Sequence, residues 1–290
     1  MRKKIKKVVF PVGGLGTRFL PATKSMPKEM LPVFNKPLIQ YAFEEARDAG
    51  IEQFIFITGR NKNTIANHFD HAYELQHVLT SKAKQEELEL AQDWLPNAGN
   101  IAFVRQQNPL GLGHAVYCAR NFIGDEPFAV ILADELLNNY KSGFLKEMIT
   151  EFESFAEDVN LLGVCEVEKK LSKNYGIIDY QVENTKLKVN NMIEKPKLED
   201  APSNLAMIGR YILQPEIFSF LAQNQIGVGG EIQLTDAMKS MSAEHKFYAK
   251  KFTGKRFDCG SPTGYVEANI SYAIDENEME MKEILRKYYE

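Results

Sequence analysis

The chain places directly after its first apolar run the segment Phe10-Pro-Val-Gly-Gly-Leu-Gly-Thr-Arg-Phe-Leu-Pro-Ala-Thr-Lys-Ser-Met-Pro-Lys-Glu-Met-Leu31. Its glycines allow close approach of a ligand and let backbone N–H groups form an anion-binding concavity; they are Gly13, Gly14 and Gly16. Its cations can neutralise a bound polyphosphate; they are Arg18, Lys24 and Lys28. The segment therefore predicts a phosphate-binding loop.

The two common nucleotide loops do not fit this segment. A dinucleotide-binding fingerprint needs a third glycine at position 19, where Phe19 stands, and a Walker A loop needs Gly-Lys followed by Ser or Thr. The loop therefore belongs to a different class of phosphate binder.

The first half of the chain reads as alternating strands and helices. Four short apolar runs are typical of central strands: Val8–Val12, Gln53–Thr58, Ile101–Arg105 and Phe128–Ala133. Helical spacing and a stop signal at Gly50 mark Pro37–Ala49 as a helix, and Leu112–Ile123 reads as another. We expect an α/β fold with a Rossmann-like, doubly wound, mixed but mainly parallel sheet flanked by helices.

The second half should add a mixed sheet region and a helical tail. Further strands are expected at 160–168, 176–181, 187–194 and 206–213, and Pro262–Glu290 reads as helix. Residues 71–93 predict one or two exposed helices, either a surface cap or an oligomer arm. No linker divides the chain, so we expect one domain over 1–290, with one half at about 1–158 and the other at about 159–290.

Composition excludes several classes of protein. A net charge of −4 gives no footprint for nonspecific nucleic-acid binding. No apolar stretch approaches the length of a membrane span, and Val8–Val12 is too short for the apolar part of a signal peptide. Three widely spaced cysteines suggest neither a disulfide framework nor a zinc cluster, so a cytoplasmic protein is expected.

Several motifs together resemble those of the sugar-1-phosphate nucleotidylyltransferases, most closely the bacterial enzymes that act on UTP and glucose 1-phosphate. Besides the loop, the matches lie at Arg105–Ala115, Ala133–Glu135, Tyr175–Asp179, Ile193–Pro196, Gly230–Asp236 and Lys255–Ser261. The resemblance covers most of the chain. It implies that the half at about 1–158 binds the nucleotide and that the half at about 159–290 binds the sugar phosphate. It implies Mg²⁺-dependent transfer of UMP from UTP to glucose 1-phosphate, with the sugar phosphate attacking the α-phosphorus and pyrophosphate leaving.

The resemblance assigns the charged residues of this chemistry. Arg18 and Lys28 would hold the triphosphate, where the plain alternative is a pair of solvated surface cations. Asp134 and Asp258 would hold Mg²⁺, which prefers oxygen ligands and commonly uses one or two carboxylates; the plain alternative for each is a cap of a helix or turn. Glu135 is the weaker candidate, because neighbours on a strand point to opposite sides.

The same resemblance assigns the base and the sugar. Gln106 and Gly111, with the first loop glycines, would read the base, although the adjacent Gln107 leaves the register open. Glu194 would hold glucose, Lys195 would bind its phosphate as a third catalytic cation, and Gly176 would admit the sugar; the plain alternative is a solvated strand edge and a turn. A role for Glu231 on the sugar side is left open, because an acidic residue in a first helical turn is equally expected.

Three further points stay open from the sequence. A related enzyme could use dTTP or another hexose 1-phosphate, because base and sugar selection depend on few contacts. A nucleotide-sugar sensor without turnover is also possible, since fold does not fix function. A homo-oligomer, dimer or tetramer, is compatible with the chain.

Overall fold

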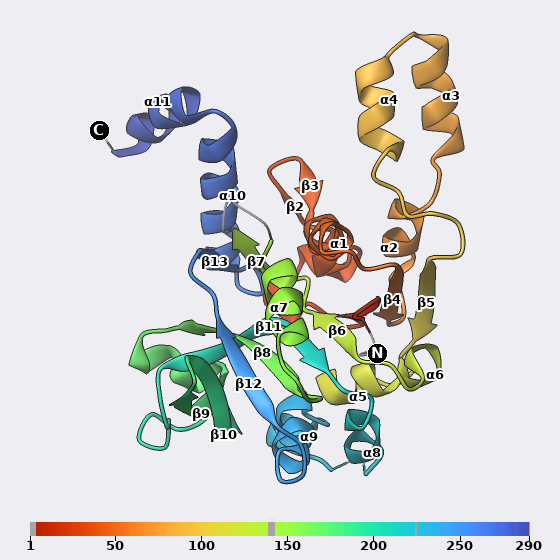
Figure 1. The fold of residues 1–290 in the computed structure, drawn as a ribbon. Helices are drawn as coiled ribbons and strands as arrows, with labels where there is room; N and C mark the ends of the chain where they lie inside the picture. The colour runs from red at the N-terminus through yellow and green to blue at the C-terminus, as the bar shows by residue number, and fades with distance from the viewer. Residues whose placement is uncertain (1–3, 139–142, 224, 290) are drawn as a thin grey trace.

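The computed structural model describes residues 4–138, 143–223 and 225–289. One nine-stranded sheet runs through the described chain, with helices on both faces (Figure 1). Its first four strands are all parallel, in the order β5 (Ile101–Arg105), β4 (Gln53–Thr58), β1 (Lys7–Val12) and β6 (Phe128–Ile131). The four apolar runs therefore form parallel strands, as the sequence predicts. The expectation that all four are central strands is wrong for β5, which is the edge strand of the sheet and has Phe103 39% exposed.

The remaining five strands correct the expectation of a mainly parallel sheet. They follow in the order β11 (Leu205–Leu213), β8 (Asn160–Glu166), β12 (Phe247–Lys251), β10 (Lys186–Glu194) and β9 (Gly176–Glu183). Only β8 and β12 pair in parallel there, and β11 also pairs with β9, which partly closes this part of the sheet. A hairpin at Asn184 and Thr185, both with positive φ, forces β9 and β10 to be antiparallel. The sheet is therefore mixed, and parallel mainly in its first half.

Helices cover the sheet because their apolar sides face it. The two helices α1 (Leu38–Asp48) and α7 (Phe144–Glu153) contact each other and contribute to one hydrophobic core. The opposite core is formed with α5 (Leu112–Tyr117), α8 (Ile217–Leu221) and α9 (Leu234–Met241). The helix predicted over 112–123 is divided, with α6 (Arg120–Ile123) as its second part.

A smaller two-stranded ribbon lies beside the main sheet. The antiparallel strands β7 (Glu135–Asn138) and β13 (Lys255–Asp258) place Asp258 opposite Glu135. A second short ribbon joins β2 (Pro32–Val33) and β3 (Lys36–Pro37). A third hydrophobic cluster packs Leu136 and Phe257 against Ala268 of α10 (Pro262–Glu276). The helical tail is confirmed, although α11 (Glu278–Tyr289) is separated from α10 at Asn277.

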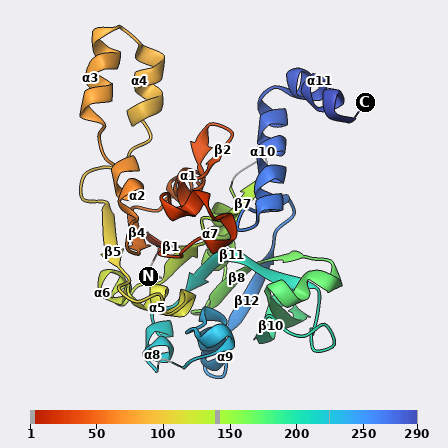
Figure 2. The same cartoon turned by 180° about the vertical axis from the view of Figure 1, so that it is seen from behind.

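A helical hairpin stands away from the body of the molecule. After α2 (Asn63–His68), the helices α3 (Tyr73–Ser81) and α4 (Gln85–Gln92) pack against each other and project beyond the sheet in both views (Figures 1 and 2). One or two exposed helices were expected at 71–93, and the structure has two. Among the described residues, no helix combines the length and apolar character needed to cross a bilayer.

Candidate active site

The fold places the glycine loop at a reversal of strand order. Taken by their order in the sequence, the parallel strands lie third, second, first, fourth across the sheet, so the winding direction changes between β1 and β6. Open α/β sheets bind ligands at the carboxyl ends of the strands at such a point. The loop follows β1 and Asp134 follows β6, and between them lies a pocket of about 440 Å³.

The pocket brings together seven of the predicted site residues. They are Gly13, Gly14, Gly16, Lys28, Gln106, Gly111 and Asp134. Glu231, left open from the sequence, also lines it, whereas Lys24 is exposed and does not. The nucleotide candidates therefore share one cavity, although they come from four separate parts of the chain.

At two positions of the pocket, neighbouring atoms leave no space for a Cβ, so glycine is needed there. A Cβ on Gly13 would lie 2.9 Å from Gln106 Oε1. Gly111 has a φ of 106°, and a Cβ there would lie 2.8 Å from the carbonyl oxygen of Ile232. Any side chain at either position would have to displace a pocket wall, so the backbone itself forms part of the surface offered to a ligand.

The loop lysine is paired with the carboxylate that follows β6. Lys28 Nζ lies 2.6 Å from Asp134 Oδ2. Burial alone would lower the pKa of Lys28, but the negative charges of Asp134 and Glu29 outweigh it and raise that pKa. Burial would likewise raise the pKa of Asp134, yet the Lys28 charge and hydrogen bond bring it below its usual range. Both groups are therefore charged near neutral pH.

A second, more deeply buried pair anchors the loop beside Lys28. Glu29 Oε2 lies 2.8 Å from Lys62 Nζ, and their side chains are 2% and 7% exposed. Within the described residues, Glu29 Oε1 has no hydrogen-bond partner, and burial raises the pKa of this carboxyl despite the Lys62 charge. The pair joins the glycine loop to the segment after β4. Sequence reasoning missed it, although Glu29 stands next to Lys28.

The two predicted metal ligands converge on one point. A Cβ built on Gly260 would lie 3.0 Å from both Asp134 Oδ2 and Asp258 Oδ1, so these oxygens are separated by no more than twice that distance. Arg18 Nη1 donates to the Gly260 carbonyl at 3.4 Å. The described residues contain no group of three or more His, Cys, Asp or Glu able to hold a metal. Two neighbouring carboxylates, completed by a ligand's phosphates, are a ligand set that Mg²⁺ commonly uses.

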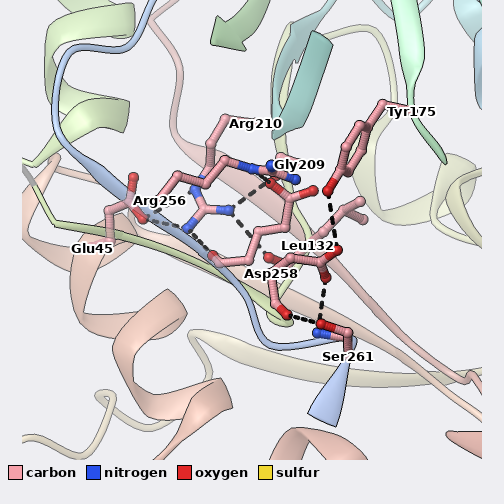
Figure 3. A network of polar contacts seen from close by, with 10 residues as sticks. Glu45, Leu132, Tyr175, Gly209, Arg210, Arg256, Asp258 and Ser261 are labelled. Carbon is pink, nitrogen blue, oxygen red and sulfur yellow. Dashed lines mark hydrogen bonds and ion pairs between the residues drawn. The ribbon is translucent and has the colours of Figure 1, made fainter. Parts of the chain in front are cut away.

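The ribbon and its neighbours position Asp258. Tyr175 donates from its hydroxyl to Asp258 Oδ2 at 3.3 Å, and Ser261 Oγ donates to the Asp258 carbonyl at 3.0 Å (Figure 3). Glu135 accepts from Arg256 Nε at 2.8 Å, and the Arg256 guanidinium stacks on the Tyr175 ring. Asp134 lines the pocket, whereas Glu135 is engaged by Arg256. Strand alternation does not explain this difference, because Asp134 lies in the turn between β6 and β7 and only Glu135 belongs to a strand.

The sugar candidates form a separate group outside this pocket. Gly176 lies opposite Glu194 in the β9–β10 pairing, and a Cβ on Gly176 would meet Glu194 Oε2 at 3.1 Å. Thr235, unrecognised in the sequence, donates to Glu194 Oε2 at 2.7 Å. Lys195 has a positive φ of 45°, its Nζ lies 3.5 Å from Glu194 Oε1, and its N–H donates to the Tyr175 carbonyl at 3.0 Å. Tyr175 thus contacts both this group and Asp258.

The structure also separates the two glutamines. Gln106 is 7% exposed and lines the pocket, whereas Gln107 lies at a different cavity with Arg105. Of the two glutamines that the sequence left open, Gln106 is therefore the one placed at the nucleotide pocket. Tyr175 and Thr235 were not predicted as site residues. The only sequence feature that indicates them is their place in the motifs, because Tyr175 precedes Gly176 and Thr235 lies within Gly230–Asp236.

Comparison with known proteins agrees with this geometry. The model of the nucleotidyl transferase family matches residues 7–274. UTP–glucose-1-phosphate uridylyltransferase of Bacillus subtilis is 46% identical over 278 residues, covering 96% of this chain and 94% of the relative. A UTP-bound UDP-glucose pyrophosphorylase from Acinetobacter baumannii has a TM-score of 0.89 and 39% identity, covering 97% of this chain and 98% of that one.

A further solved structure, a UDP-glucose pyrophosphorylase complexed with UDP-glucose, has a TM-score of 0.82 and 42% identity, with coverage of 93% of this chain and 99% of that one. These similarities extend over nearly the whole chain and agree with the family that its motifs indicate. The chain therefore belongs to the nucleotidyl transferase family and, within it, to the bacterial UTP–glucose-1-phosphate uridylyltransferases.

Proposed function

We propose that this protein transfers UMP from UTP to glucose 1-phosphate, giving UDP-glucose and pyrophosphate. The observation that carries the proposal is that Lys28 and Asp134, which line the pocket, lie close to Asp258, with Arg18 near the same glycine, Gly260. The reaction joins two anions, and two unit charges about 4 Å apart repel by roughly 4 kcal/mol at an effective dielectric of 20. Fixed cations and close positioning are therefore its main requirements.

The nucleotide binds between the glycine loop and Gln106. Gly13, Gly14 and Gly16 bring the backbone to the triphosphate, while Gly111 and Gln106 receive the base. Lys28 and Arg18 neutralise the phosphates from the loop side. The ion pair with Asp134 keeps Lys28 at the pocket, and from there its ammonium group can shift to the phosphates when the nucleotide enters.

Asp134 and Asp258 are the residues that would hold Mg²⁺. The bound ion would supply charge neutralisation and Lewis-acid polarisation of the α-phosphate. Both carboxylates are kept in place by the protein, Asp134 at the end of β6 and Asp258 by the β7–β13 ribbon and Tyr175. Lys28 can leave Asp134 for the phosphates, so the carboxylate that it pairs with in this structure becomes available to the metal.

The sugar phosphate occupies the neighbouring group of residues. Glu194 accepts hydrogen bonds from glucose hydroxyls, and Lys195 binds the phosphate. The expected role of Gly176 in admitting the sugar is not supported, because a Cβ at Gly176 would clash with Met207 Cε and would meet Glu194 Oε2 at 3.1 Å. An in-line attack of the sugar-phosphate oxygen on the α-phosphorus then releases pyrophosphate, without a covalent intermediate on the protein. Lys195 orients the attacking group and lowers its repulsion from the nucleotide.

The first test is pyrophosphate release by purified protein with Mg²⁺ and glucose 1-phosphate, using UTP, dTTP, CTP, ATP and GTP in turn. Selective turnover with UTP supports the proposal. Preference for dTTP, or turnover only with another hexose 1-phosphate, assigns a different substrate pair to the same mechanism. Binding of nucleotide without turnover of any pair would identify a sensor.

We also infer three properties that depend on the whole chain. Residues 1–290 act as one domain, because the nine-stranded sheet continues from the nucleotide half into the sugar half. The free thiols of Cys118, Cys165 and Cys259 favour a reducing, cytoplasmic setting. The exposed α3–α4 hairpin is compatible with a homo-oligomer, and light scattering would measure its stoichiometry.

A further inference from the structure

The Gln106 side-chain amide is held by two acceptors on one side. Its Nε2 donates to the carbonyl of Gly111 at 3.1 Å and to His114 Nδ1 at 3.0 Å. A primary amide has two N–H donors, so these contacts use both of them. Because Gln106 is 7% exposed, no bulk water competes for these donors. The orientation of the amide is thereby fixed.

The fixed amide presents its oxygen to the nucleotide pocket. Gln106 Oε1 lies toward Gly13, where a Cβ would approach it to 2.9 Å. Rotating the amide by half a turn would bring Oε1 against Gly111 O and His114 Nδ1. The amide oxygen, itself an acceptor, would then face two other acceptors with no hydrogen between them. Such unmatched buried contacts are costly. The pocket wall therefore offers a base an acceptor at this position.

The arrangement requires a neutral His114 ring. An Nδ1 that accepts a hydrogen bond belongs to a neutral ring with its proton on Nε2. Burial, and then the charge of Arg120, lower the pKa of His114 and favour the neutral ring near pH 7. The other neighbour recorded at Nδ1 is the Cys118 thiol, whose Sγ lies 4.0 Å away.

We propose that His114 is a specificity-determining residue, which holds the Gln106 amide with its oxygen toward the base and so selects pyrimidines that carry a donor at N3. Uracil and thymine present N3–H between two carbonyl oxygens, whereas cytosine presents a lone pair at N3 and a donor at position 4. The acceptor Gln106 Oε1 matches the first pattern and opposes the second. This inference deepens the proposed uridylyltransferase function and rests on it.

The test compares UTP with CTP in a matched set of variants. His114→Leu places a methyl group where Nδ1 stood, His114→Asn places an acceptor oxygen at the same distance from the backbone, and Cys118→Ala removes only the neighbouring thiol. The readouts are kcat and KM for each triphosphate with glucose 1-phosphate, together with direct binding of UTP and CTP and the melting temperature of each variant.

We expect His114→Leu to lower the UTP-to-CTP ratio of kcat/KM on the order of tenfold, the scale of one lost buried hydrogen bond, mainly through a higher KM for UTP. His114→Asn and Cys118→Ala should keep the parental ratio. An unchanged ratio in His114→Leu, or equal losses in the Leu and Asn variants, would overturn the proposal. Failure of the proposed function is distinct, because the parental protein would then not turn over UTP.

Discussion

The nucleotide side and the sugar side of the site hold their cations in different ways. On the nucleotide side, Lys28 and Lys62 are paired with carboxylates, at 2.6 Å and 2.8 Å. On the sugar side, Lys195 is 43% exposed and lies 3.5 Å from its own neighbour Glu194. Its position depends on a left-handed backbone and on the N–H donated to Tyr175. Charge pairs organise the first region, and backbone geometry organises the second.

This difference predicts different responses to mutation. A buried charge that loses its partner leaves the other charge uncompensated, which affects both binding and stability. A half-exposed cation is compensated by water, so its removal should affect the reaction with the sugar phosphate and leave the stability unchanged. Nucleotide-side substitutions should therefore couple activity to stability, and sugar-side substitutions should not.

The largest effect is expected for Asp134→Asn. The change keeps the size of the side chain but removes the charge that faces Lys28 and the proposed Mg²⁺. We expect kcat to fall by at least about 100-fold, the scale of a lost electrostatic contact to the reacting phosphates. Pyrophosphate release over a Mg²⁺ titration measures it. Asp258→Asn should behave similarly in activity, while exposed Asp48→Asn serves as the control. If Asp134→Asn and Asp258→Asn both kept the parental Mg²⁺-dependent rates, the assignment of these two residues as metal ligands would be wrong.

The buried pair behind the loop gives the next effect. Lys62→Met leaves Glu29 buried without its cation, so we expect a loss of about 3–5 kcal/mol in the free energy of unfolding and a higher KM for UTP. Denaturant unfolding and initial rates measure the two. The control is Lys6→Met, which breaks an exposed ion pair with Glu52 and should change neither. Equal losses of stability in the two variants would show that the buried Glu29–Lys62 pair contributes no more to the free energy of unfolding than the exposed Lys6–Glu52 pair.

Lys195→Ala tests the sugar side. Loss of one charge-assisted hydrogen bond should raise the KM for glucose 1-phosphate on the order of tenfold. The KM for UTP and the melting temperature should stay at the parental values, because Lys195 is half exposed. A parental KM for the sugar phosphate would reject the assignment. A large fall in melting temperature would instead remove the contrast between the two sides.

The same contrast explains what the sequence could and could not predict. Apolar runs predicted the parallel strands, because a central strand must be apolar on both faces. The strand β12 was missed, because Phe247–Lys251 ends in two lysines and so lacks a continuous apolar run. Its partners in the sheet, β8 and β10, also lie far away in the sequence. The motifs contain seven predicted residues that line the pocket, whereas the predicted sugar residues lie outside it. They could not predict the Glu29–Lys62 pair, because pairing between segments depends on how the loop after β4 folds back onto the glycine loop.

Tyr175 joins the two regions and should give the smallest effect. Its hydroxyl donates to Asp258 at 3.3 Å, whereas its carbonyl accepts from Lys195, so Tyr175→Phe removes the first contact and keeps the second. A single hydrogen bond of about 1 kcal/mol predicts a several-fold higher Mg²⁺ requirement, with an unchanged KM for glucose 1-phosphate. A Mg²⁺ titration of turnover, and Mn²⁺ binding to the protein with UTP, measure the change. If the KM for glucose 1-phosphate rose as much as the Mg²⁺ requirement, the Tyr175 hydroxyl would position residues on both sides of the site. The nucleotide side and the sugar side would then not be separated at Tyr175.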